Sequence, residues 1–458
     1  MNEFSKLKDV SKLITKGTTP TSVGGSFTEK GINFIKSESI TGSKFLNNSV
    51  FAFIDDSTDL KLKRSRIKTN DLLFSIAGAY LGKISIVQEC DVPANTNQAV
   101  GIVRVDQSLA DVNYLYYYFF QNSVNEYINK LSSQSSQPNL NLELLGNLEF
   151  KSRKLESQQK IATVLSALDD KIELNNQINT ELEAMAKTLY DYWFVQFDFP
   201  DENGKPYKSS CGKMVFNETL KREIPVGWEV KKVEELVSEI NTGLNPRTHF
   251  KLGEGDNFYI TIRNIEYGIL NFTDSCDRIS DVSLQRIQKR SRLEKGDILF
   301  TSIEPVGKTY LLREKPINWN INESVFSIKP NYELVTSEFL FMLLSSFEMK
   351  LKCKNSSTGS IHKGIRINPL KEFCFSYAGV EIQKSFSDKI KPILDRIDLN
   401  QKQNQELAQL RDWLLPMLMN GQVRVGSGEY ESEEESLGMV GEEKANYQNK
   451  ENIQVENL

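Results

Sequence analysis

Residues 155–194 read LESQQKIATVLSALDDKIELNNQINTELEAMAKTLYDYWF, and residues 380–419 read VEIQKSFSDKIKPILDRIDLNQKQNQELAQLRDWLLPMLM. A shift of 225 positions (397 − 172) superposes the two stretches. The matched positions step by three and four, which is the pattern of a coiled-coil seam, so we expect two long, related helices. The seam consists of Leu165, Leu168, Ile172, Asn175, Asn179, Leu182 and Leu189, matched by Ile390, Ile393, Ile397, Asn400, Asn404, Leu407 and Leu414.

The two asparagines in each seam bear most directly on pairing. A polar residue at a seam position costs stability and fixes register. Two helices that carry Asn-x-x-x-Asn at the same phase are therefore expected to pair with each other. The alternative is a pair of ordinary amphipathic helices, each packed separately into a core. That alternative gives no reason for the matched polar positions.

Composition sets the class of protein. A chain of 458 residues has the length of two or three domains, and 39% hydrophobic with 26% charged residues suits a soluble globular protein. No run of about 18 apolar residues occurs, and the start MNEFSKLKDVSK lacks the apolar core of a signal peptide, so we expect a cytoplasmic protein without a membrane partner. The five cysteines are scattered and never spaced C-x-x-C, which argues against a disulfide framework or a metal site.

The net charge of −5 does not describe the folded part of the chain. Residues 426–458 contain nine Glu and two Lys, so the residues before them carry a charge of +2. We expect the acidic tail, residues 422–458, to be disordered. The body is only mildly basic, so an argument for DNA binding must rest on local patches.

The 225-residue repeat extends beyond the long helices. LKDVSKLITKG (7–17) aligns with VEELVSEINTG (233–243), NTNQAVGIVRV (95–105) aligns with NINESVFSIKP (320–330), and other segments follow. Each copy contains short β-rich runs with one helix among them, at 112–131 and 337–352. We interpret the aromatic stripe of the first helix (Tyr114, Tyr117, Tyr118, Phe119) as core rather than as a base-stacking surface.

The expected domain organisation follows from this duplication. A helix of about 40 residues is about 60 Å long, and antiparallel pairing would place the two globular halves at opposite ends with a modest linker. Parallel pairing needs the linker to span the full helix length, which it could do only if stretched. The sequence predicts an α+β protein with these parts: a first globular half 1–153, a long helix 154–197, a linker 198–223, a second globular half 224–378, a second long helix 379–421, and the acidic tail.

This layout, and the sequences at its joints, resemble the specificity subunit (HsdS) of Type I restriction–modification systems. The resemblance covers about residues 1–425 and rests on ITKGTTP and INTGLNP near the start of each half, NTNQAV and NINESV, SSQPNLNLELL followed by ESQQKIATVLSALDDKIELNN, and KTLYDYWFVQFDFP. The second copy departs from the helix pattern at Ser385, and with Trp413-Leu414-Leu415-Pro416.

The resemblance implies a non-catalytic DNA-recognition subunit. Each half would be a target recognition domain that reads one part of a split, asymmetric site on double-stranded DNA. The paired helices would separate the parts and dock two methyltransferase subunits, and restriction/translocase subunits would join them. S-adenosylmethionine, ATP and Mg²⁺ would bind the partner subunits, so we expect no cofactor on this chain.

Candidate DNA contacts fall into two sets, basic clusters for phosphates and loop polar residues for base edges. Each basic cluster alone is better explained as a solvated surface, and only the recurrence of clusters at related places in both halves makes DNA contact an equal alternative. The turns at Lys83 and Lys308 could bring backbone close to phosphate or be ordinary turns. The clusters are Lys61, Lys63, Arg64 and Arg66 in the first half, and Arg286, Lys289, Arg290 and Arg292 in the second. The base-reading candidates are Lys36, Ser37, Gln134, Ser135, Ser136 and Gln137, against Thr261, Arg263, Ser360, His362, Lys363 and Arg366.

Enzymatic alternatives fail for lack of motifs. The nearest string to an adenine methyltransferase site is Asn368-Pro369-Leu370, which lacks the second Pro and the aromatic residue, and no G-x-G-x-x-G or Walker A string occurs. Pro200-Asp201 followed by Glu229-Val230-Lys231 mimics a nuclease carboxylate pattern, but Asp201 falls in the expected linker. A coiled-coil adaptor that binds no DNA is the remaining alternative to the recognition subunit.

Overall fold

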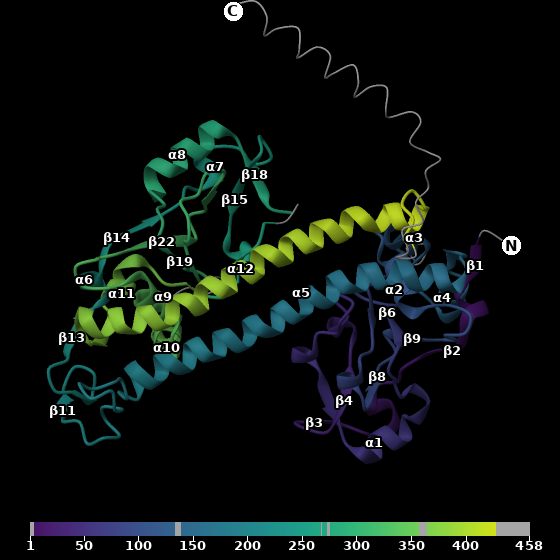
Figure 1. The fold of residues 1–458 in the computed structure, drawn as a ribbon, viewed down its shortest axis with the longest axis horizontal. Coiled ribbons are helices and arrows are strands. Elements are labelled where there is room, and N and C mark those ends of the chain that lie inside the picture. The colour runs from purple at the N-terminus through teal and green to yellow at the C-terminus, as the bar shows by residue number, and fades with distance from the viewer. Residues whose placement is uncertain (1–3, 133–138, 267, 273–274, 357–363, 427–458) are drawn as a thin grey trace, which may run out of the picture. The chain divides into compact units, whose positions relative to one another are not determined.

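The computed structural model describes residues 4–132, 139–266, 268–272, 275–356 and 364–426 (Figure 1). The chain divides into two compact units, one formed by residues 1–171 with those from 407 onward, and the other by residues 172–406. The division cuts both long helices, α5 (Leu155–Tyr190) and α12 (Gly379–Asn420). Each unit therefore contains one globular half, the beginning of one long helix and the end of the other.

The long helices pair antiparallel within each unit. In the second unit, Asn175 Nδ2 donates to Asn404 Oδ1 at 2.8 Å, and Asn400 Nδ2 donates to Asn179 Oδ1 at 2.8 Å. A later residue of α5 thus meets an earlier residue of α12. The first unit has the same direction, because Arg153 donates to the Met419 carbonyl at 2.8 Å while Asp169 accepts from Arg411. The pairing expected from the asparagine pattern is confirmed, and so is the antiparallel direction favoured by the short linker.

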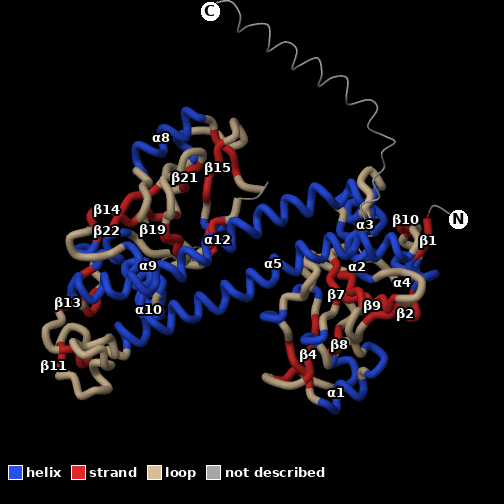
Figure 2. Tube along the Cα trace, in the orientation of Figure 1, coloured by secondary structure: helices blue, strands red, loops and turns tan. Residues whose placement is uncertain are grey.

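The first half contains two small sheets, whose strands are red in Figure 2. The first sheet is antiparallel, and in the second sheet β4 and β8 run parallel. The first has the order β2 (Ser11–Lys16), β9 (Val100–Val105), β6 (Asp71–Ser75) and β7 (Ile84–Ile86). The second has the order β3 (Phe27–Thr28), β5 (Ala52–Ile54), β4 (Ile32–Ile35) and β8 (Ala94–Thr96).

Helices and one further strand pair complete the first half. The antiparallel pair joins the start of the chain to the strand that precedes α5. These elements are α1 (Asp56–Lys61), α2 (Val112–Phe120), α3 (Asn122–Ser132), α4 (Leu142–Gly146), β1 (Phe4–Lys6) and β10 (Glu149–Lys151).

The second half repeats this topology, which confirms the duplication. Its antiparallel sheet has the order β14 (Val237–Thr242), β22 (Val325–Pro330), β19 (Ile298–Thr301) and β20 (Thr309–Leu311). Its second sheet has the order β18 (Asp277–Ile279), β15 (Asn257–Ile260) and β21 (Trp319–Ile321), again with one parallel pair. The counterparts of the first half's helices and outer strands are α8 (Asp281–Ser291), α9 (Ser337–Ser345), α10 (Phe347–Ser356), α11 (Ile367–Lys371), β13 (Glu229–Lys232) and β23 (Cys374–Tyr377).

The aromatic stripe of α2 is core, as interpreted. Tyr114, Tyr117 and Phe119 are fully buried, and Tyr118 packs partly buried against the same cluster. The single helix expected over 112–131 is two helices instead. Gln121 interrupts it with an extended ψ of 135°, and Ser346 interrupts the second copy with a ψ of 156°. The apolar pattern continues through both breaks, so the pattern alone did not reveal them.

The segment expected to be a linker is folded. It contains the hairpin of β11 (Met214–Asn217) and β12 (Arg222–Pro225), and a π-helical turn at Asp191–Val195 precedes it. Phe199 stacks between Tyr207 and Trp228, with ring centroids 4.8 and 5.2 Å away. The aromatic residues supply an apolar anchor that a count of Gly, Pro, Lys and Ser does not show.

The two halves contact the long helices through different chemistry. In the first unit, the Asp169 carboxylate on α5 accepts hydrogen bonds of 2.7 Å from the Tyr117 hydroxyl and from Arg411 on α12. Burial and the Asp169 charge raise the pKa of Tyr117, which keeps this hydroxyl protonated as a donor. In the second unit, Met342 of α9 and Leu394 of α12 pack in an apolar cluster. The first contact is a buried polar network and the second is an apolar core.

Candidate nucleic-acid interface

Both halves carry the tetrapeptide Lys-Arg-Ser-Arg at related positions, 63–66 and 289–292. The first tetrapeptide follows α1, mostly in a short 3-10 helix, and the second spans the C-terminal end of α8. The serine is buried and the three cationic residues are exposed in both copies. The same element therefore presents a cluster of positive charge in each half.

A buried serine–asparagine pair holds each tetrapeptide. Ser65 Oγ donates to Asn95 Oδ1 at 2.7 Å, and Ser291 Oγ donates to Asn320 Oδ1 at 2.8 Å. Both asparagines are fully buried and lie on the strand that runs parallel to its neighbour, β8 or β21. A buried and satisfied polar network is rigid, because breaking it leaves unpaired groups in a low-dielectric interior. The charged side chains thus project from a fixed backbone.

The asparagines are in turn held differently in the two halves. Asn95 donates to Asp59 Oδ1 at 3.0 Å, and Asp59 also pairs with Arg66 at 2.6 Å. Asn320 instead donates to Gln288 Oε1 at 2.8 Å. Both halves therefore have an asparagine at this position. Its side-chain amide donates to a charged carboxylate in the first half and to a neutral amide oxygen in the second.

The tetrapeptide of the second half also lines a shallow pocket with a volume of about 330 Å³. Lys289, Arg290 and Arg292 surround it together with Thr242, whose hydroxyl accepts from Arg290 Nε at 3.2 Å. The buried Asn241 Nδ2 atom at this surface has no hydrogen-bond partner among the described residues. Three cations and an unused amide donor favour an anion such as a phosphate.

Besides Arg66, three further predicted basic residues are partly engaged by groups of their own half. Arg286 donates to the His249 carbonyl at 2.6 Å, and Arg292 lies 3.3 Å from the Glu239 carboxylate. Lys61 reaches the Gly24 carbonyl at 3.5 Å. Surface pairs of this kind contribute little free energy, so a phosphate can compete for these cations.

The residues expected near β4 and β15 lie at one edge of the second sheet in each half. Lys36 and Ser37 follow β4, and Thr261 and Arg263 follow β15. The Lys36 ammonium lies 4.9 Å from the Phe27 ring centroid, Arg263 is exposed, and Thr261 donates to Asn264 at 3.0 Å. Lys36 and Thr261 are thus held by contacts within their own half, and the Arg263 side chain is exposed.

Sequence reasoning missed polar residues that share this edge. Parallel strands end at a common edge, so the loops after β8 and β21 bring Gln98 and Glu323 there. Thr19 contacts the Gln98 side chain, and Asn245 donates to Glu323 at 2.8 Å. These two residues, together with Asn95 and Asn320, lie in the repeated strings NTNQAV and NINESV, so the repeat itself could have identified them.

Lys83 and Lys308 follow glycines with a positive φ, Gly82 at 82° and Gly307 at 84°. Each glycine lies near the end of a loop, 76–83 between β6 and β7 and 302–308 between β19 and β20. The Lys83 ammonium lies 5.2 Å from the Tyr80 ring centroid. An ordinary turn accounts for this geometry, and contact with phosphate stays a prediction.

Several base-reading candidates lie outside the described residues, namely Gln134, Ser135, Ser136, Gln137, Ser360, His362 and Lys363. The residues that follow these segments bridge to equivalent places. Asn139 pairs with Ala77, and Gly364 pairs with Ile303. Arg366 is described and exposed.

Neither a metal centre nor a membrane segment occurs in the described part of the chain. Its His, Cys, Asp and Glu side chains form no group of three suited to hold an ion. None of its helices combines the length and apolar character needed to cross a membrane.

Comparison with known proteins points to one family. The model of the Type I restriction modification DNA specificity domain matches residues 2–184 and again residues 225–409. The MjaIX specificity subunit of a Type I restriction enzyme from Methanocaldococcus jannaschii is 26% identical over 425 residues, which covers 92% of this chain and 94% of that protein. The HindI specificity subunit from Haemophilus influenzae is 24% identical over 440 residues, covering 85% and 94%.

A solved structure agrees in fold. The crystal structure of the S subunit of a Type I restriction–modification system from M. genitalium matches with a TM-score of 0.54 and 16% identity, and it covers 91% of this chain and 95% of that one. Because the family model matches most of the chain in two copies that coincide with the duplicated halves, the chain belongs to the Type I restriction–modification DNA specificity family.

Proposed function

We propose that this chain is the DNA sequence-specificity subunit of a Type I restriction–modification complex, and that each half reads one part of a bipartite, asymmetric target. The observation that carries the proposal is the cationic tetrapeptide, held by a buried serine–asparagine pair in each half. In this proposal, the tetrapeptide of each half contacts DNA phosphates and so sets the register of that half on the DNA. The polar residues at the neighbouring sheet edges differ between the halves, as base-reading residues of an asymmetric site must.

The long helices have features of a docking surface for two copies of one partner. Leu174 and Leu399 occupy equivalent positions in the repeat and are 49% and 55% exposed. Met185 and Leu410 are a second equivalent pair, 56% and 43% exposed. The support for a protein contact is that exposed apolar side chains recur at equivalent positions of both helices, since single exposed apolar residues are common on any surface. In this proposal, two methyltransferase subunits dock on the helices, restriction/translocase subunits join them, and all cofactors bind those partners.

The alternatives account for less of the chain. Asp201 of the nuclease-like string accepts hydrogen bonds of 2.8 Å from the backbone of Asn203 and Lys205, so it stabilises a turn. An adaptor that binds no DNA leaves the two equivalent cationic tetrapeptides without a role. Cleavage of DNA by the isolated chain, lost in Asp201→Ala, would favour the nuclease.

A domain exchange tests the recognition proposal. Residues 224–378 are replaced by the second half of another specificity subunit, and the product is expressed with its methyltransferase partner. We expect methylome sequencing to show that one part of the target changes while the other part stays. A change in both parts, or in neither, contradicts the proposal.

An insertion tests the role of the helices as a spacer. Four residues inserted within Thr180–Glu183 of α5 add about 6 Å and about one turn, which keeps the seam nearly in phase. We expect a longer non-specific spacer with both recognised parts unchanged, again measured by methylome sequencing. An unchanged spacer with altered recognised bases would exclude this role.

A further inference from the structure

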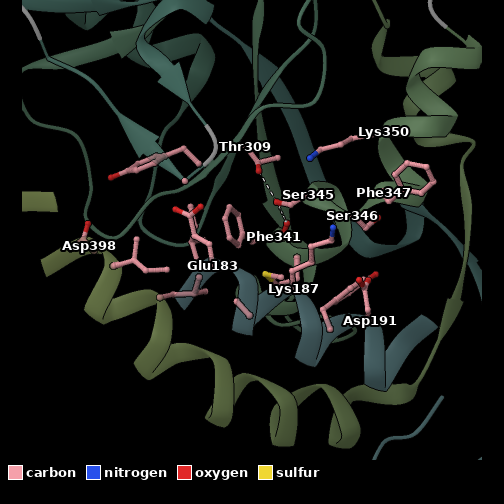
Figure 3. A pocket seen from close by; sticks show the side chains of 18 of the residues that line it. Glu183, Lys187, Asp191, Thr309, Phe341, Ser345, Ser346, Phe347, Lys350 and Asp398 are labelled. Atoms are coloured by element: carbon pink, nitrogen blue, oxygen red, sulfur yellow. Dashed lines mark hydrogen bonds between the residues drawn. The ribbon is translucent and has the colours of Figure 1, made fainter. Parts of the chain in front are cut away.

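The second unit contains a cavity of about 360 Å³ between the long helices and the second half (Figure 3). Its lining includes the apolar side chains Ala186, Leu311, Phe341, Met342, Leu394 and Ile397. The exposed side chains of Glu183, Lys187 and Phe347 mark its mouth. We call this cavity the second-half pocket. Its volume is in the range of small-molecule sites, which combine apolar walls with a few polar groups.

In the first half, the position equivalent to the second-half pocket is filled by side chains. Under the 225-residue shift, Ala186 corresponds to Arg411 and Ser345 corresponds to Phe120. The Arg411 guanidinium lies 4.9 Å from the Phe120 ring centroid and pairs with Asp169 at 2.7 Å. Burial opposes its charge, but the Asp169 and Asp412 carboxylates raise the pKa of Arg411. A large charged side chain therefore occupies in the first half the position that Ala186 holds in the second.

The polar partners of Arg411 have changed together with it. Asp169 corresponds to Leu394, and Tyr117 corresponds to Met342. The second half has thus lost the arginine, its carboxylate, its hydroxyl and its stacking ring. An unfilled apolar cavity lowers stability in proportion to its volume. Four coordinated changes that leave such a cavity are better explained by a site for a ligand than by one packing defect.

The polar groups of the pocket indicate the charge of that ligand. Burial and the neighbouring Lys187 ammonium lower the pKa of Lys350. Figure 3 shows these two lysines on the side of the Thr309 and Ser345 hydroxyls, where Asp191 also lies near Lys187, with Glu183 and Asp398 on the other side. Asp398 is paired with Lys402 at 3.2 Å. An anion between the two ammonium groups relieves their repulsion and gains charge-assisted hydrogen bonds.

We propose that the second-half pocket binds a small organic anion with a ring-sized apolar body, whose acid group is held by Lys187 and Lys350. The apolar body replaces the arginine and phenylalanine side chains that fill the equivalent space in the first half. The site is separate from the cationic tetrapeptides, so it goes beyond DNA recognition. The pocket lies wholly within the second unit.

Fluorescence titration of the full chain with anilinonaphthalene sulfonate tests the proposal, with the uncharged phenylnaphthylamine as the matched probe. We expect one saturable site for the sulfonate, and binding of the neutral probe about tenfold weaker, a difference of about 1.4 kcal/mol. Ala186→Phe fills the pocket and should abolish this site. Lys187→Gln with Lys350→Gln leaves the pocket open and should remove the preference for the sulfonate.

Two control variants keep the test specific. Ala184→Phe adds the same ring at an exposed position of α5 that does not line the pocket, and Lys391→Gln removes an exposed lysine of α12. Both should bind the sulfonate as the unchanged chain does. Circular dichroism checks that each variant is folded. Non-saturable binding, binding that persists in Ala186→Phe, or equal affinity for both probes would overturn the proposal. Since no DNA or partner is present, this outcome is independent of the recognition function.

Discussion

The two halves keep one backbone topology but join the long helices in opposite ways. In the first unit, Tyr117, Asp169 and Arg411 form a buried hydrogen-bonded network. In the second unit, the equivalent positions are Met342, Leu394 and Ala186, which line a cavity. A buried charge needs its partner, so such a network can only be kept or replaced as a set. The comparison teaches that duplication preserved the frame and changed whole groups of contacting side chains.

The largest effect is expected from breaking the polar network. Arg411→Met keeps much of the bulk but leaves the Asp169 charge buried without its cation, which should cost about 3–5 kcal/mol of unfolding free energy. Leu394→Met, at the position equivalent to Asp169, conserves volume and should cost less than about 1.5 kcal/mol. Urea denaturation of both variants measures the contrast.

The double variant Asp169→Leu with Arg411→Met sharpens this test. It removes both buried charges and leaves only the Tyr117 hydroxyl without its acceptor, so it should recover most of the stability that Arg411→Met loses. Equal losses in the single and double variants would show that the side chains pack independently, contrary to the network interpretation.

An effect of intermediate size, on DNA binding, is expected for the cationic tetrapeptide that the two halves share. Arg64→Ala and Arg290→Ala each remove one exposed cation of the tetrapeptide, and each should weaken DNA binding of the complete methyltransferase complex by about tenfold or less. The loss should be similar for target and non-target DNA, and the dependence on salt should fall by about one counterion. Electrophoretic mobility shift at several salt concentrations measures both. A loss confined to target DNA would instead assign a base contact to that arginine.

The smallest effect concerns the cavity. Ala186→Met extends a flexible apolar side chain into the second-half pocket and should raise stability by about 0.5–2 kcal/mol, as cavity-filling changes commonly do. Thermal unfolding measures the shift, with Ala184→Met on the exposed face of α5 as the control. Destabilisation by Ala186→Met alone would indicate that the pocket has no room for it.

Much of this architecture could be predicted because repeats and helix periodicity are local properties of a sequence. The breaks at Gln121 and Ser346 could not, because the apolar pattern runs through them unchanged. The folded hairpin at β11 and β12 was also hidden, since its stability depends on stacking of Phe199 with Trp228, which is distant in sequence. Among the candidate contacts, the cationic residues were visible in the sequence, whereas the buried asparagines that hold them were not assigned a role.

The sequence by itself determined the duplication, the two long helices, and the asparagine positions at which they meet. Only the tertiary structure decided that Asn175 meets Asn404 rather than its own counterpart Asn400, and that Arg411 from the end of the chain completes the first unit. The physical reason is that periodicity and composition are properties of the linear sequence. Which buried charge is paired, and which volume is left empty, depends on side chains that folding brings together from distant segments.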